Sequence, residues 1–256
     1  MDKSTIVDYF KNQAITGTWA SLYDPTNNIS YPFIQRFVKT VKLMQPIQGN
    51  ILDMGCGTGI MVKVVTDAKA SYTGFDEAQE MIDACMTKFQ QEIRNGQAEF
   101  ILAEAKGFKS NKLFQSAVGM GYIEYFDKPE QVFIQVSNYL AKGGKLILSF
   151  PHRNSIDYFM VQLFYPFRKA LTALTGKKTI KPDRKMWSKN EAIELYQKYG
   201  YKNIITVNYN INFIHYPLTK IFPTLSNKIS SMIEHSSLLS KISFFATGFI
   251  ICAVKD

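Results

Sequence analysis

A glycine-rich turn between a short apolar strand and a helix constrains this 256-residue chain more than any other feature. Residues 50–54 form a short apolar run, Gly55, Gly57 and Gly59 follow it, and residues 60–68 carry a helical pattern. Glycines let a backbone approach a ligand closely, and the start of a helix offers free N–H groups. The arrangement therefore predicts an α/β fold with a ligand-binding loop at this turn.

Strand and helix patterns alternate from this turn to residue 150. The expected strands lie at 71–76, 99–102, 114–120 and 145–150, and the expected helices lie at 78–93 and 131–140. Two more strands are expected near the end of the chain, at 201–211 and 244–254. Such alternation predicts a doubly wound, mostly parallel seven-stranded sheet with helices on both faces.

Helices are expected on both sides of this core. Apolar residues at helical spacing predict helices within the first 45 residues and an aromatic-rich helix at 155–175. A basic loop at 176–187 follows, and Ser188 with Glu191 three residues later predicts the capping box of another helix. The stretch at 212–243 reads as polar and partly helical.

We consider three kinds of ligand for the glycine loop. A dinucleotide loop needs a sixth-position glycine where this chain has Ile60, and the charge of Asp53 would repel a pyrophosphate. A P-loop needs a Gly-Lys-Ser/Thr sequence, which is absent. A cationic nucleoside is compatible with Asp53. Asp76 ends the next strand, 21 residues after Gly55, where a carboxylate accepts ribose hydroxyls.

The run Asp53-x-Gly55-x-Gly57-x-Gly59, followed by Asp76, resembles the S-adenosylmethionine (SAM) site of class I, Rossmann-like methyltransferases of the small-molecule type. The similarity continues in order through Gly74-Phe75-Asp76, Ala103-Glu104-Ala105, Phe114 to Tyr125 and Leu140-x-x-Gly143-Gly144-x-Leu146. Two positions depart from the family pattern, because Gln115 and Glu104 stand where the family has aspartate.

The resemblance implies one methyltransferase domain over residues 1–256 and a cofactor site. The domain would comprise an N-terminal helical lid at 1–46, a SAM-binding core at 47–151, a cap insertion and helix at 152–199, and final strands with a helical connection at 200–256. The implied cofactor-binding residues are Asp53, Gly55, Gly57 and Gly59 around the methionine, Asp76 at the ribose, Met81 and Glu104 at the adenine, and also Cys56, Glu77, Ala105, Met120, Trp19 and Tyr23.

Methyl transfer needs an aligned acceptor and a site shielded from water, and it needs a general base only for a hydroxyl or a protonated amine. Ligands of open α/β sheets bind at the carboxyl ends of the strands. His152 and Glu124, which follow two strands, are therefore the candidate catalytic residues. A loop histidine that only bonds nearby backbone is the alternative for His152. The candidate substrate-binding residues are Tyr122, Tyr125, Arg153 and Tyr158.

Charge divides the chain into two halves. Residues 129–256 carry a formal charge of +10 and residues 1–128 carry −1, while the stretch 153–189 alone carries +7 next to aromatic side chains. Such a stretch suits an anionic membrane surface or a lipophilic acceptor. It also suits a cap helix whose aromatics pack inward, or, less well, a nucleic acid, because no RNA-binding module is recognisable.

These features predict a SAM-dependent methyltransferase of a small, lipophilic or aromatic acceptor, with O-methylation favoured. The alternatives are an RNA methyltransferase that uses the basic cap and a non-catalytic SAM-binding partner protein. Three distant cysteines and the spacing of the three histidines argue against a metal site. We expect a cytoplasmic protein, because no signal-peptide pattern is visible and the longest apolar run, 244–254, is too short to span ~30 Å of bilayer.

Overall fold

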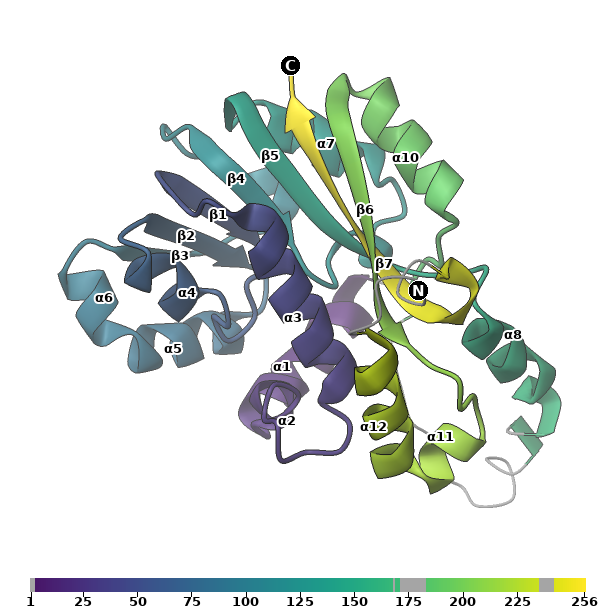
Figure 1. Ribbon diagram of the computed structural model, residues 1–256. Helices are drawn as coiled ribbons and strands as arrows, with labels where there is room; N and C mark the ends of the chain where they lie inside the picture. The colour runs from purple at the N-terminus through teal and green to yellow at the C-terminus, as the bar shows by residue number, and fades with distance from the viewer. Residues whose placement is uncertain (1–2, 168, 171–182, 235–241) are drawn as a thin grey trace.

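A computed structural model describes residues 3–167, 169–170, 183–234 and 242–256. One seven-stranded sheet with the strand order β3-β2-β1-β4-β5-β7-β6 runs through it (Figure 1). Its strands are β1 (Asn50–Met54), β2 (Ser71–Asp76), β3 (Ala98–Leu102), β4 (Phe114–Gly119), β5 (Leu140–Pro151), β6 (Tyr201–Ile211) and β7 (Ala246–Lys255). The first five strands are parallel, and β7 pairs antiparallel with β5 and β6. The predicted fold class is confirmed.

Helices cover both faces because alternate strand residues point to opposite sides. Leu52 and Leu146 join one apolar cluster with α7 (Glu130–Ser137) and α10 (Lys189–Lys198). Their sequence neighbours Ile51 and Ile147 join a second cluster on the other face. That face is covered by α3 (Tyr31–Met44), α4 (Val62–Asp67) and α5 (Gln79–Lys88).

The N-terminal helices lie beside the carboxyl ends of β1 and β2. Helix α1 (Lys3–Ile15) packs on α5, where Lys11 Nζ lies 2.9 Å from Glu80 Oε1, and α2 (Thr18–Ser21) follows it. These helices belong to the segment predicted to form a lid, and that role stays a prediction.

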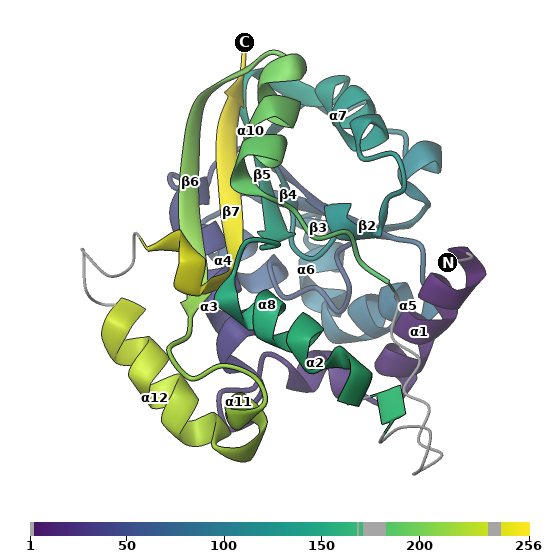
Figure 2. The same ribbon diagram turned by 90° about the vertical axis from the view of Figure 1, so that its right-hand side faces the viewer.

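A cap lies at the end of the molecule away from the C-terminus (Figures 1 and 2). It contains α8 (Ile156–Leu163), α11 (Leu218–Ile221) and α12 (Pro223–Glu234). The backbone N–H of Tyr216 donates to Asp157 Oδ1 at 3.3 Å and joins the segment before α11 to α8. Between the cap and β6, Ser188 and Glu191 form the predicted capping box at the start of α10.

Two expected helices are interrupted in the structure. The helix predicted at 78–93 is divided at Phe89, whose backbone leaves the helical region (φ −113°, ψ 34°) where its ring is buried against Phe100, and α6 (Gln90–Arg94) follows. The helix predicted at 155–175 is interrupted at Phe164, and residues 165–167 and 169–170 are helical again. Residues 171–182, where its end and part of the basic loop were expected, lie outside the described residues. Within the described ranges, no helix combines the length and apolarity needed to cross a bilayer.

Candidate active site

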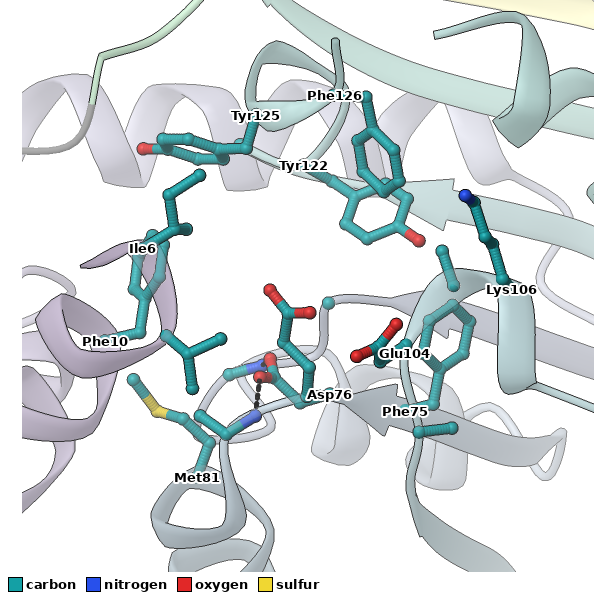
Figure 3. Close-up of a pocket in the computed structure, with 18 of the residues that line it drawn as sticks. Ile6, Phe10, Phe75, Asp76, Met81, Glu104, Lys106, Tyr122, Tyr125 and Phe126 are labelled. Atoms are coloured by element: carbon teal, nitrogen blue, oxygen red, sulfur yellow. Dashed lines mark hydrogen bonds between the residues drawn. The ribbon is translucent and has the colours of Figure 1, made fainter. Parts of the chain in front are cut away.

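A cavity of about 400 Å³ opens at the carboxyl ends of β1, β2, β3 and β4, beside α1 (Figure 3). Its size is typical of sites for small molecules. Predicted site residues that line it are Gly55, Gly57, Asp76, Glu77, Met81, Glu104, Ala105, Met120, Tyr122, Tyr125 and Trp19. The structure thus brings together side chains from the lid, the glycine loop and the ends of three strands.

The glycine loop is built so that no side chain fits at two of its positions. Gly55 and Gly57 have φ values of +66° and +52°, a region that favours glycine. A Cβ on Gly55 would lie 2.7 Å from the Tyr122 ring, and one on Gly57 would lie 2.6 Å from Trp19 Nε1. The bare backbone of the loop therefore faces the cavity directly.

Gly59 and Cys56 serve the packing beneath the loop and do not line the cavity. Gly59 has φ +73°, and a Cβ there would lie 2.6 Å from the ring of Phe89. Cys56 is buried, and its N–H donates to the carbonyl of Phe75 at 2.9 Å. These contacts seat the loop on the core.

Asp76, the last residue of β2, has its carboxylate fixed by two backbone donors. Gly57 N–H donates to Oδ2 at 2.9 Å, and Ala78 N–H donates to Oδ1 at 3.0 Å. Burial raises the pKa of Asp76, and these N–H groups oppose that shift. The carboxylate faces the cavity (Figure 3).

The lining carries more acidic than basic groups. Its charged residues are Asp76, Glu77, Glu104 and Asp127 against Lys106 and Lys128. An acidic cavity attracts a ligand that carries positive charge and hydroxyl or amine donors.

Asp53 lies behind the loop and outside the cavity lining. Its Oδ2 accepts a hydrogen bond from the Tyr72 hydroxyl at 2.9 Å, and only 3% of the residue is exposed. Burial raises the pKa of Asp53 to about 7, opposed by the bond from Tyr72 and assisted by the charge of Asp76.

Aromatic side chains close the cavity on the lid side. The Phe10 ring stands edge-on to Trp19 at 5.3 Å and to Tyr125 at 5.4 Å between ring centroids. Ile6 and Phe10 project from α1 toward the space faced by Tyr125 (Figure 3). Tyr23 lies outside the lining, and its hydroxyl accepts from Arg36 Nη2 at 3.2 Å.

The predicted substrate residues fall into two groups. Tyr122 and Tyr125 line the cavity, and burial raises the pKa of both, so their hydroxyls stay protonated at neutral pH. Arg153 and Tyr158 lie outside the lining. Arg153 Nη2 is 2.9 Å from Glu191 Oε2, and the N–H of Tyr158 donates to Ser155 Oγ in the first turn of α8.

Both candidate catalytic residues are buried and lie outside the lining. His152 Nδ1 is 3.2 Å from the carbonyl oxygen of Ala246, and burial lowers the pKa of the ring. Burial raises the pKa of Glu124, and the charges of Arg36 and Arg184 oppose that shift. The catalytic roles of His152 and Glu124 stay predictions.

Several lining residues were not among the predicted site residues. They are Ile6, Val7, Phe10, Phe75, Ala78, Ala103, Lys106, Gly121, Phe126, Asp127, Lys128 and Gln131. The sequence could have identified Gly121 as a site residue, because it is the second glycine of Gly119-Met120-Gly121 at the end of a strand. It has φ +67°, and a Cβ there would lie 2.8 Å from Arg36 Nη1. In the described part of the chain, no group of three or more His, Cys, Asp or Glu side chains is arranged to hold a metal ion.

Comparisons with known proteins agree with this geometry. A family model described as a methyltransferase domain matches residues 29–206. The magnesium protoporphyrin IX methyltransferase of Synechocystis PCC 6803, solved with bound S-adenosylhomocysteine, superposes with a TM-score of 0.64 at 14% identity, covering 100% of both chains.

Curated relatives match over shorter stretches. The "Probable 18S rRNA (guanine-N(7))-methyltransferase" of Dictyostelium discoideum is 28% identical over 43% of this chain, which spans only 41% of that relative. The ubiquinone biosynthesis O-methyltransferase of Pseudomonas fluorescens is 25% identical over 66% of this chain and 72% of that protein. Because the family model covers more than two thirds of the sequence, the chain belongs to the methyltransferase domain family.

Proposed function

We propose that this protein transfers the methyl group of S-adenosylmethionine to a small, lipophilic or aromatic acceptor, at a hydroxyl oxygen. One observation carries the proposal. The Asp76 carboxylate, held by Gly57 N–H at 2.9 Å and Ala78 N–H at 3.0 Å, faces a cavity that the bare backbone of Gly55 and Gly57 also lines.

The residues present fit this cofactor. Gly55 and Gly57 offer backbone where a Cβ would collide with an aromatic ring, and Asp76 offers a fixed acceptor for hydroxyl groups. Met81, Ala105 and Met120 add an apolar wall suited to adenine. When bound, S-adenosylmethionine supplies a methyl group already activated by the positive charge on sulfur. The excess of acidic groups in the lining favours binding of that charge.

The aromatic side of the cavity supports an apolar acceptor. Phe10, Trp19 and Tyr125 close this side, exclude water and offer ring faces and edges to an apolar molecule. Relatives named for O-methylation in ubiquinone biosynthesis match up to two thirds of the chain, which supports an oxygen acceptor. The acidic lining makes a strongly anionic acceptor unfavourable.

Asp76→Ala tests the cofactor site. It should weaken S-adenosylmethionine and S-adenosylhomocysteine binding by about 1–3 kcal/mol, because hydrogen bonds to the carboxylate are lost. Isothermal titration calorimetry measures this change, and Asp67→Ala, an exposed aspartate at the end of α4, is the matched control. Equal affinities for both variants and the unmodified protein would remove Asp76 from the site and contradict the proposal.

The acceptor class is tested by the release of S-adenosylhomocysteine with hydroxylated aromatic and lipophilic compounds. The second candidate, an RNA methyltransferase, draws on the +7 charge of residues 153–189 and on the relative named for ribosomal RNA. It requires RNA affinity that falls steeply with salt and turnover with RNA. A non-catalytic partner protein would bind the cofactor and release no product with any acceptor.

A further inference from the structure

Helix α12 is only partly amphipathic in the usual sense: Ile229 and Ile233 are half-buried, but other positions depart from the pattern. It buries the small polar residues Ser226 and Ser230, and Ser230 Oγ donates to Asn212 Oδ1 at 2.5 Å. It exposes Leu225 and Met232, which are 50% and 70% accessible. A surface helix normally turns its large apolar side chains toward the core, so the exposure of Leu225 and Met232 departs from the usual pattern.

Large apolar side chains are also exposed on α11 and α8. Leu218 and Ile221 on α11, Leu225 on α12 and Phe222 between the two helices are each at least half exposed. Phe159 and Leu163, four residues apart on α8, are exposed by 61% and 60%. The Phe164 and Tyr216 rings, 5.9 Å apart, and the hydrogen bond from Tyr216 to Asp157 hold the two segments together. We call these six exposed residues the cap face.

Charge around the cap face is positive. Lys220 and Lys228 are exposed on α11 and α12. The carboxylate of Glu234, the only acidic residue of these two helices, faces Lys39 Nζ at 2.6 Å. Helix α8 itself carries one charged residue, Asp157, whose Oδ1 accepts the hydrogen bond from the Tyr216 N–H.

We propose that the cap face docks on an anionic lipid bilayer. Apolar side chains beside lysines are the pattern of helices that lie in the membrane interface. Helices of four to twelve residues are too short to cross a bilayer, which leaves docking in the plane of the surface. The proposal rests on the proposed function in one respect, since a docked enzyme would meet a lipophilic acceptor where that acceptor dissolves.

Other occupants fit less well. A second copy of a chain with net charge +9 would place like charges against each other. A single-stranded nucleic acid binds by stacking bases on aromatic rings. Four of the six cap-face residues are leucine or isoleucine, on which bases do not stack.

Vesicle flotation tests the proposal with the full chain. We expect binding to vesicles of phosphatidylcholine mixed with phosphatidylglycerol, weaker binding to phosphatidylcholine alone, and release from the anionic vesicles at high salt. Absence of binding to the anionic vesicles at low salt would overturn the proposal.

Matched substitutions locate the surface. Ile221→Asp should weaken vesicle binding about tenfold, whereas Ile134→Asp, at a 55% exposed isoleucine of α7, should leave it unchanged. Lys220→Gln and Lys228→Gln should each weaken it about fivefold, with Lys142→Gln as the control. Equal behaviour of Ile221→Asp and Ile134→Asp would overturn the cap face as the docking surface.

A short single-stranded RNA and a cofactor titration complete the design. RNA binding that Ile221→Asp abolishes, without vesicle binding, would overturn the lipid proposal in favour of RNA. Calorimetry on the same samples should show unchanged S-adenosylhomocysteine affinity for Ile221→Asp. If the unmodified protein bound no cofactor, the proposed function would be wrong. If it bound the cofactor but no vesicles, only the docking inference would be wrong.

Discussion

In the glycine loop, an aromatic ring already fills the space beside each glycine. On the cap face, by contrast, much of the surface of each large side chain contacts no other part of the described chain. A Cβ on Gly55, Gly57 or Gly59 would lie 2.6–2.7 Å from Tyr122, Trp19 or Phe89. On the cap face, Ile221 is 62% exposed and Leu163 is 60% exposed. The fold of this chain therefore restricts which residues the loop can carry, whereas it leaves the exposed side chains of the cap face largely unrestricted.

The largest effect should come from filling the loop. Gly59→Val should cost about 2–5 kcal/mol of unfolding free energy, because a left-handed backbone strains any other residue and the added atoms collide with Phe89. Gly96→Val has a similar φ of +69° and open space, so it should cost only about 1–2 kcal/mol. Urea denaturation measures both. Equal costs would show that the packing beneath the loop is looser than the structure indicates.

A second test uses the buried carboxylate behind the loop. The pKa of Asp53 is raised to about 7 in the folded protein. The contribution of this carboxyl group to the unfolding free energy is therefore fully present below its unfolded-state pKa and is lost as the pH rises through about 7. Between about pH 4 and about pH 8 this loss amounts to at most about 4 kcal/mol.

Asp53→Asn should therefore gain stability relative to the unmodified protein as the pH is raised, since the amide keeps a partner for Tyr72 without a charge. Urea denaturation of both proteins across this pH range, without cofactor, measures the difference. Asp67→Asn, at an exposed residue, is the control. Parallel pH profiles for Asp53→Asn and the unmodified protein would contradict the raised pKa.

The smallest effect should be on the cap. Met232→Ala should change the unfolding free energy by no more than about 0.5 kcal/mol, because the side chain is 70% exposed. The same change at Met44, which is fully buried at the end of α3, should cost about 2–5 kcal/mol. A cost at Met232 approaching that at Met44 would mean that the exposed side of α12 packs within the chain, and the contrast between the cap and the loop would disappear.

Local patterns predicted much of the fold. The strands at β1, β2 and β6 begin and end within a residue of the expected positions, and the capping box at Ser188 and Glu191 forms as expected. These features depend on residues near each other in sequence. The break at Phe89 does not, because it depends on a distant ring, Phe100 of β3, against which Phe89 packs.

The residues of the candidate site show the same difference between features fixed by local sequence and features fixed by distant residues. Residues tied to the loop motif or to the strand ends, such as Gly57, Asp76 and Tyr122, line the cavity. His152 and Glu124 also follow strands, yet the fold places both outside the lining in buried surroundings. Position after a strand fixes the end of the sheet at which a residue lies, but the direction of its side chain depends on the neighbouring elements.

The sequence by itself determined the glycine loop, the alternation of strands and helices and the likeness to methyltransferases, because each is encoded by residues close together in the chain. The tertiary structure decided the strand order, the antiparallel placement of β7, the aromatic closure of the cavity and the exposure of the cap face. Periodicity shows which side chains share a helix face. Whether that face is covered depends on elements far away in sequence, so only the folded chain reveals it.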